Sequence, residues 1–277
     1  NKERFLKERM LFDITLFSDD SKIQRKPKGH LYLYPLIAIA AMLAIVFVMD
    51  LPHMHKPKQQ LSQTIRIPAG QRAQMDLPDG SIVWLNSQTT LTYDENFGKK
   101  DRKVTLDGEA YFEVAHNKEI PFYVQTENIK VQVTGTKFDV CSYKGSNSFI
   151  ARLIEGSINL LTNNAKEEKP ITSLTKGKYF SMENGKYKTG EMSSNNALAW
   201  MQGIYYFDDV PFKELLDKIA LYYNYKITVK NPKILENYRC TGKFKDLDGI
   251  EHILKVIQKD HPFKYNIDNE HNKITIE

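Results

Sequence analysis

The chain has 277 residues, of which 41% are hydrophobic and 26% are charged. Its net charge of +5 is unevenly placed, since residues 1–30 hold eight basic and five acidic side chains and the remainder is nearly neutral. No broad basic face is expected, which excludes nucleic acid as a partner.

An uncharged apolar run of nineteen residues, Leu31–Met49, is the first predicted element. At about 1.5 Å of helical rise per residue it nearly matches a hydrocarbon core of roughly 30 Å, so it predicts a single membrane-spanning helix. By the positive-inside rule we expect residues 1–30 to be a cytoplasmic tail and the larger part of the chain to lie beyond the membrane. Two prolines and many polar residues predict a linker over residues 50–62. The basic side chains that set this orientation are Lys22, Arg25, Lys26 and Lys28.

A cleaved signal peptide and a buried core helix are the alternatives for this run. It is longer than the apolar region of a signal peptide, and the arm before it is also too long. A core helix is rarely apolar on every face for about five turns. Because the chain begins with Asn, we expect the cytoplasmic part to continue upstream.

Residues 63–191 predict an all-β antiparallel domain, because apolar and polar residues alternate in short runs with turn signals between them. The run EAYFEVA illustrates the pattern, with Glu109, Tyr111 and Glu113 at the outward positions. No helical period is visible over this stretch, so a sandwich, roll or solenoid-like sheet is expected.

Residues 200–277 predict a small α+β domain with the element order βαββαββ. Apolar residues recur at helical spacing from Phe212 to Tyr223 and again from Ile250 to Ile257, with Asp248 as the expected N-cap of the second helix. Two helices on one face of a small sheet would enclose a modest core.

Catalytic motifs are scarce, and neither a cofactor nor a metal site is expected. Glu109 and Glu113 lie on one face of a strand and could serve glycoside hydrolysis, although outward polar residues are equally typical of a half-exposed strand. Cys141 and Cys240 could pair beyond the membrane, but buried free thiols are the preferred interpretation.

The run VTGTKFDV is the sharpest short motif. It indicates either a glycine bulge between two strands or a strained backbone at Gly135, with the Thr136 hydroxyl beside the preceding carbonyl. The residues alone favour the bulge.

Longer runs carry a family resemblance from about Gln63 to Phe180. IRIPAGQRAQMDLPDGSIVWLNSQTTLTY, VTLDGEAYFEVAHNKEIPFYVQT, VQVTGTKFDV and LIEGSINLL, in this order, closely resemble the periplasmic domain of FecR-like sigma-regulator proteins. WMQGIYYFDDVPFKELLDKIALYYNYKI resembles the C-terminal module of the Bacteroidetes-type members, which is similar to the secretin/TonB short N-terminal fold.

The resemblance implies a single-pass inner-membrane anti-sigma factor, not an enzyme, with a cytoplasmic N-terminus and periplasmic C-terminal domains. It implies two partners, an extracytoplasmic-function sigma factor and the signalling domain of a TonB-dependent outer-membrane transporter for iron chelates or glycans. Pairing with the transporter is expected through exposed strand edges. The candidate residues for that pairing are Tyr205, Tyr206, Phe207, Ile274, Thr275 and Ile276.

Some relatives are cut at a Gly-Thr step that matches Gly135–Thr136. The resemblance therefore implies a one-time self-cleavage with Thr136 as the nucleophile, for which a strained backbone is the physical requirement. The tail 1–30 departs from the family because it is shorter than the usual anti-sigma domain. Sigma binding by residues 1–30 alone, and the choice between inhibition and activation, therefore stay open.

Two other functions compete with this one. A membrane-anchored periplasmic module that binds glycan or another envelope polymer would need an exposed aromatic strip, to which Trp84, Tyr93 and Tyr111 are the candidates. An anchored hydrolase would use Glu109 and Glu113.

Overall fold

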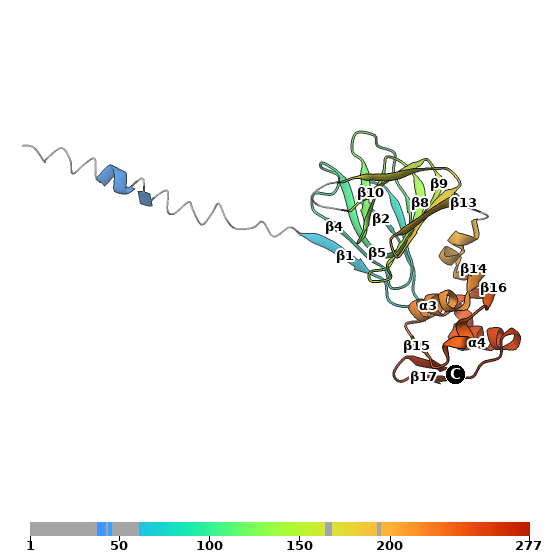
Figure 1. Ribbon diagram of the computed structural model, residues 1–277. Helices are drawn as coiled ribbons and strands as arrows, with labels where there is room; N and C mark the ends of the chain where they lie inside the picture. Colours follow the sequence, from blue (N-terminus) through green and yellow to red (C-terminus); the bar gives the residue numbers. More distant parts are fainter. Residues whose placement is uncertain (1–37, 43, 46–60, 164–167, 193–194) are drawn as a thin grey trace, which may run out of the picture. The chain divides into compact units, whose positions relative to one another are not determined.

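The computed structural model describes residues 38–42, 44–45, 61–163, 168–192 and 195–277, and the chain divides into two compact units, residues 1–59 and 60–277 (Figure 1). In the first unit, residues 38–42 and 44–45 are helical with exposed side chains. The tail 1–30 and the rest of the predicted span lie outside the described residues. Within the described part of the chain, no helix has the length and apolar character needed to cross a membrane.

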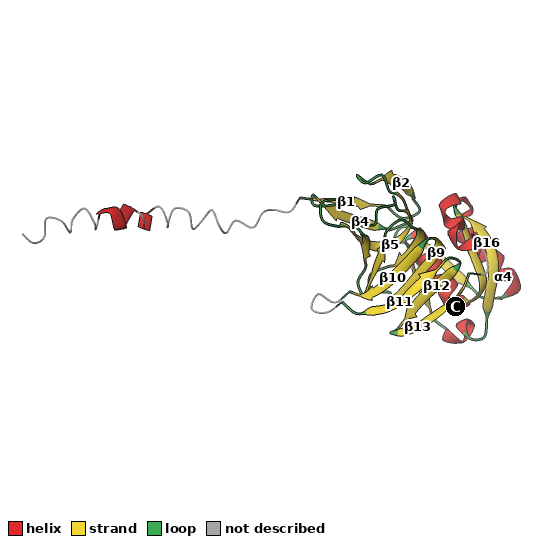
Figure 2. Cartoon of the chain, turned by 90° about the horizontal axis from the view of Figure 1, so that it is seen from above, coloured by secondary structure: helices red, strands yellow, loops and turns green. Residues whose placement is uncertain are grey.

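The described strands between residues 62 and 191 form one continuous 13-stranded sheet, which β5 divides into two halves, sheet A and sheet B (Figure 2). We call this region the β-sandwich. Sheet A contains β1 (Ser62–Arg66), β4 (Thr90–Asp94), β5 (Arg102–Glu113), β6 (Phe122–Gln125), β7 (Ile129–Val133), β10 (Ser157–Thr162) and β11 (Pro170–Thr175). Sheet B contains β2 (Ala73–Asp76), β3 (Ile82–Leu85), the second half of β5, β8 (Lys137–Ser142), β9 (Ser148–Glu155), β12 (Lys178–Glu183) and β13 (Lys186–Glu191).

The long strand β5 joins the two sheets and turns a corner at Gly108. Its first half pairs with β4 and β6, and its second half pairs with β3 and β8. Gly108 has φ +135, and a Cβ there would lie 2.6 Å from the Thr89 Cα. Only glycine fits both the backbone conformation and the close approach, so this residue permits the shared strand.

One apolar core lies between the sheets, and the predicted alternation is confirmed. Ala110 and Phe112 of β5 are fully buried in it, as are Phe138 and Val140 of β8. The all-β character of this region is therefore confirmed.

The prediction of purely antiparallel pairing is wrong at one pair, because β6 runs parallel to the first half of β5. Parallel neighbours need a crossover connection. Here the second half of β5, which belongs to sheet B, and the loop 114–121 provide it.

Residues 204–276 form the C-terminal module, joined to the β-sandwich through the 3₁₀ helix η1 (Asn195–Gln202). Its elements are β14 (Ile204–Pro211), α3 (Phe212–Tyr223), β15 (Lys226–Val229), η2 (Pro232–Leu235), β16 (Arg239–Lys245), η3 (Asp246–Asp248), α4 (Gly249–Asp260), β17 (Tyr265–Asp268) and β18 (Lys273–Ile276). The predicted order βαββαββ is confirmed. The expectation of one small sheet is wrong, because β14 pairs with β16 and a separate sheet has the order β15–β18–β17.

Both predicted helices bury one face, as their apolar spacing requires. Leu215 and Ile219 of α3 and Ile253 and Leu254 of α4 are almost completely buried in a second apolar core. Asp248 precedes α4 but makes no side-chain cap, because its Oδ2 accepts instead from the Lys245 N–H, 3.1 Å away.

Candidate functional site

The Gly135–Thr136 step lies at a bend between β7 and β8. Thr136 is 3% exposed, and its hydroxyl donates to the Ser157 carbonyl at 3.0 Å. Gly135 does not have a positive φ, so its backbone lacks the left-handed conformation that would indicate strain. Glycine is needed there for another reason, since a Cβ would lie 2.4 Å from His116 Nδ1.

The peptide is also covered from the turn between β9 and β10. Gly156 has φ +93, and a Cβ there would lie 2.9 Å from Thr136 Oγ1 and 3.1 Å from the Gly135 carbonyl oxygen. Gly156 and the His116 imidazole therefore enclose the step closely. Cleavage itself stays a prediction.

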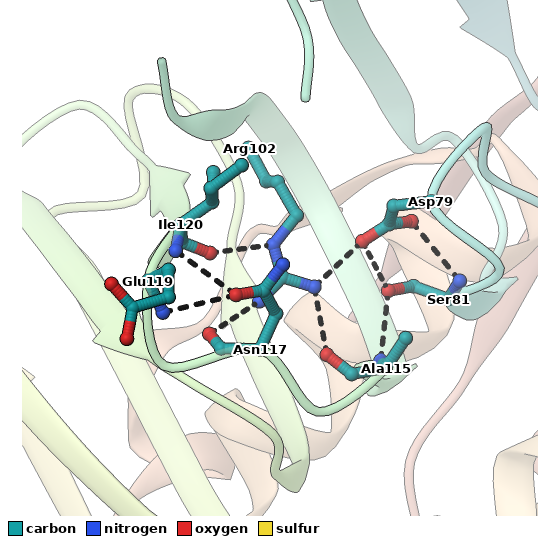
Figure 3. A network of polar contacts seen from close by, with 7 residues as sticks. All are labelled: Asp79, Ser81, Arg102, Ala115, Asn117, Glu119 and Ile120. Atoms are coloured by element: carbon teal, nitrogen blue, oxygen red, sulfur yellow. Dashed lines mark hydrogen bonds and ion pairs between the residues drawn. The ribbon is translucent and has the colours of Figure 1, made fainter. Parts of the chain in front are cut away.

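A buried arginine holds the loop that carries His116 (Figure 3). Arg102 is 2% exposed and forms an ion pair with Asp79 Oδ2 at 2.9 Å. Its guanidinium also donates to the carbonyl oxygens of Ile120, Ala115 and Asn117. Asp79 in turn accepts from Ser81, so the arginine links strand β5 to the turn before β3.

A pocket of about 390 Å³ opens beside this network and is lined in part by Phe97, Arg102 and His116. Neither Glu109 nor Glu113 lines it. The polar groups of Arg102 are already engaged by the protein, so their first role is to hold the loop in place.

Three charged side chains are buried together on the outer face of sheet B, a cluster that the sequence analysis did not predict. Arg152 of β9 contacts Asp139 Oδ2 at 2.5 Å and Glu109 Oε1 at 3.8 Å. Asp139 is 0% exposed and Glu109 is 4% exposed. We call these three residues the carboxylate cluster.

The C-terminal module and η1 cover the carboxylate cluster. Tyr222 of α3 points its hydroxyl toward Glu109 Oε2, 3.5 Å away, and Asn86 donates to the same oxygen at 2.6 Å. Trp200 of η1 is 4% exposed, and its indole N–H has no hydrogen-bond partner among the described residues. Burial, opposed by Arg152 and aided by Glu109, raises the pKa of Asp139 from 3.8 to about 7.

The end of α3 is capped by the β-sandwich. The Tyr222 carbonyl accepts from the Gly70 N–H and from the Ser87 hydroxyl, each at 3.0 Å, and the Leu221 carbonyl accepts from the Gln88 amide. The last carbonyls of a helix lack partners within it, so these donors satisfy them across the interface. An ion pair between Arg72 and Asp246, at 3.1 Å, closes the same contact.

Of the two strands predicted to bind a partner, β14 and β18, only β14 has an edge that no described strand pairs. β18 lies between β15 and β17, so the prediction of a free edge at Ile274, Thr275 and Ile276 is wrong. Ile274 and Ile276 are completely buried because this strand is the centre of its sheet.

β14 keeps one edge that no described strand pairs, since it pairs with β16 on its other edge. Tyr206 is 37% exposed, whereas Tyr205 and Phe207 are buried. Tyr205 stacks on Tyr222 with ring centroids 4.2 Å apart, so it supports the docking of the module instead of meeting a partner.

Two competing interpretations lose their structural basis. Tyr93 and Tyr111 are buried, and Trp84 packs on Tyr111 with centroids 5.5 Å apart, so these aromatics form no exposed strip. Glu109 is buried and paired, so the expected half-exposed acidic pair with Glu113 is also wrong. Alternation did place Glu109 and Tyr111 outward, but a second module covers that face.

Cys141 and Cys240 are both free thiols. Within the described residues, no group of His, Cys, Asp and Glu side chains is arranged to hold a metal ion. The signals that could have revealed the carboxylate cluster are an aspartate inside the apolar run KFDVC and a tryptophan inside a polar connection.

The sequence of the chain matches two family models. FecR protein matches residues 63–159, and the C-terminal region of FecR matches residues 204–276. No curated protein matches the chain.

Two crystal structures of a candidate anti-sigma factor from Parabacteroides distasonis ATCC 8503, at 2.50 Å and 1.65 Å resolution, are similar in fold. Each is 24% identical to this chain with a TM-score of 0.67, and each match covers 78% of this chain and 98% of the other. The two family matches together cover more than half of the chain, so it belongs to the FecR family.

Proposed function

We propose that the chain is a membrane-anchored anti-sigma regulator that relays the state of a TonB-dependent outer-membrane transporter to an extracytoplasmic-function sigma factor. The observation that carries this proposal is the presence of both FecR regions in order on one chain. The fold shared with a candidate anti-sigma factor supports it.

A transcriptional reporter for the cognate sigma factor tests the proposal in the native cells. Deleting the regulator changes reporter output, and deleting residues 1–30 alone has the same effect if that tail contacts the sigma factor. An envelope-binding protein would leave the reporter unchanged in both strains. The sign of the change distinguishes inhibition from activation.

Anchoring through residues 31–49, with the N-terminus in the cytoplasm, is part of the proposal. The apolar run and the basic residues before it support this orientation. Residues 38–42 and 44–45 are helical and uncharged, as a membrane-spanning helix requires. Protease added outside spheroplasts should digest residues 61–277 and spare an epitope placed at the N-terminus.

The transporter's signalling domain is proposed to pair with the free edge of β14. The exposed Tyr206 ring and the unpaired strand edge support this site. Tyr206→Ala should weaken binding of the transporter's signalling domain at least tenfold, an effect of about 1.4 kcal/mol, without unfolding the chain. Tyr187→Ala is the matched control, because Tyr187 is an exposed tyrosine of β13 in the β-sandwich. Equal binding by the two variants would place the partner surface elsewhere.

A single self-cleavage between Gly135 and Thr136 is the finer part of the proposal. The Thr136 oxygen would attack the Gly135 carbonyl carbon, an ester bond would replace the peptide C–N bond, and the hydroxyl proton would pass to the freed amine. Water would then hydrolyse the ester. The buried hydroxyl and its close packing support the site, although the ordinary φ of Gly135 supplies no strain.

Mass spectrometry of the purified chain tests the cleavage. A fragment that begins at Thr136 is expected, with loss of that fragment in Thr136→Ala and retention in Thr136→Ser. A single intact chain from native cells would contradict this part and leave the regulator proposal unaffected.

A further inference from the structure

The carboxylate cluster holds one more negative than positive group in a buried site. Glu109 and Asp139 both form their ion pairs with the guanidinium of Arg152. An uncompensated buried charge is costly, and the usual remedy is uptake of a proton. The charge count alone therefore indicates a protonated carboxyl in the docked arrangement.

Asp139 is the carboxyl with an oxygen left free to take the proton, since only its Oδ2 contacts Arg152, at 2.5 Å. Glu109 Oε2 already accepts from Asn86, 2.6 Å away, and lies 3.5 Å from the Tyr222 hydroxyl. Asp139 Oδ1 is buried and has no hydrogen-bond partner among the residues that the structure describes. The pKa of Asp139, raised to about 7 chiefly by burial, agrees with this assignment.

The burial of Asp139 depends on docking. Phe138 and Val140 point into the core between the sheets, so alternation places Asp139 on the outer face of sheet B. Trp200 of η1 lies over Asp139, and Tyr222 of the C-terminal module lies over Glu109. If the module leaves, the carboxylate meets water and its pKa returns toward the ordinary value.

We propose that docking of the C-terminal module on the β-sandwich is controlled by a proton on Asp139, so that the module is held closed in acid and loosens as the pH rises. This inference concerns the contact within the chain and stands independently of the proposed sigma and transporter partners.

Proton linkage sets the direction in which docking depends on pH. The docked form has the higher pKa, so it binds the proton more tightly, and docking weakens as the pH rises from the ordinary value toward about 7. Between pH 6 and pH 8 the docking constant is expected to fall about tenfold. Above about pH 8 the curve flattens because both forms are then deprotonated.

The other groups near Asp139 do not offer the same switch. The charged and titratable groups that face the site are Arg152 from β9, Glu109 and Tyr111 from β5, Cys141 from β8, Tyr143 after β8, and Tyr222 and Lys218 from α3. Burial raises the pKa of Tyr143 and of Tyr222 well above the ordinary value, so neither titrates between pH 6 and pH 8. Burial raises the pKa of Tyr111 to about 12 and that of Cys141 well above its usual value. Both therefore stay neutral between pH 6 and pH 8.

Hydrogen–deuterium exchange of the full chain in detergent micelles tests the proposal. The Gly70 amide donates across the interface to the Tyr222 carbonyl and also to Ser87 Oγ, which itself donates to that carbonyl. Undocking removes the shared acceptor, so protection of the segment 68–72 reports docking. Protection factors already correct for the intrinsic pH dependence of exchange. In the wild type, protection of this segment should fall about tenfold from pH 6 to pH 8. Protection of β7, remote in sheet A, should stay constant.

Three variants make the test specific. Asp139→Asn should abolish the pH dependence, while Glu113→Gln, which alters a half-exposed carboxyl paired with Lys137, should behave as the wild type. Burial is the main cause of the raised pKa of Asp139, and the Glu109 charge adds to it, so Glu109→Gln should move the fall to lower pH. This shift keeps the test valid even if Asp139→Asn fails to fold. A flat wild-type profile, or an unchanged profile in Asp139→Asn or Glu109→Gln, would overturn the proposal.

Discussion

Arg102 shows how one side chain can determine the path of a loop. Its guanidinium donates to three carbonyls and pairs with Asp79, and its planar fork is suited to several acceptors at once. Lysine has a single ammonium group and cannot reach the same set.

We predict that Arg102→Ala lowers the free energy of unfolding by about 3–5 kcal/mol, because the half-buried Asp79 loses its ion pair and three loop carbonyls lose their donor. Urea denaturation followed by circular dichroism measures the loss. Lys103→Ala changes the next residue of β5, which is exposed, and should stay within about 0.5 kcal/mol of the wild type. A cost for Arg102→Ala as small as that of the control would mean that the loop is held by other contacts.

At the residue scale, the sequence predicted which side chains enter the core but missed which polar ones are buried. Ala110 and Phe112 follow from the period of two along a strand. Asp139 and Arg152 do not, because their contact depends on the register of β8 and β9, which lie side by side only in the fold. The role of Gly135 was also missed, since its neighbour His116 comes from another segment.

At the element scale, the end of α3 depends on the β-sandwich. Ser87 is completely buried, donates to the Tyr222 carbonyl and accepts from the Gly70 N–H. A helix end buried against another part of the chain needs such partners.

Ser87→Ala should therefore lower the free energy of unfolding by about 1–2 kcal/mol and speed amide exchange in the segment 68–72. Ser173→Ala is the control, because it removes an exposed hydroxyl that bonds Asn159 at 2.8 Å on β10. If both variants match the wild type in exchange and stability, the contribution of the Ser87 cap is negligible.

Helices and strands were predictable at this scale, but their partners were less so. Apolar spacing located α3 and α4 because each helix buries a single face. Nothing in the strand run KITIE indicates that β18 is central in its sheet, since partners on both sides come from distant segments. The parallel pair of β5 and β6 escaped prediction for the same reason.

At the scale of the whole molecule, the docking of the C-terminal module reverses two interpretations drawn from the residues. An outward face with Trp84, Tyr111 and Glu109 resembles a binding or catalytic surface until a second module covers it. The covered face suits a regulator whose parts must communicate, because contacts at α3 and η1 join the two FecR regions.

Co-purification of the full chain from its own membranes in mild detergent tests the regulatory account most directly. Mass spectrometry should find a sigma factor and a TonB-dependent transporter with the wild-type chain. The transporter should be depleted with Tyr206→Ala and retained with Tyr187→Ala. Recovery of envelope polymer or unrelated envelope proteins, with no sigma factor in any sample, would contradict the account.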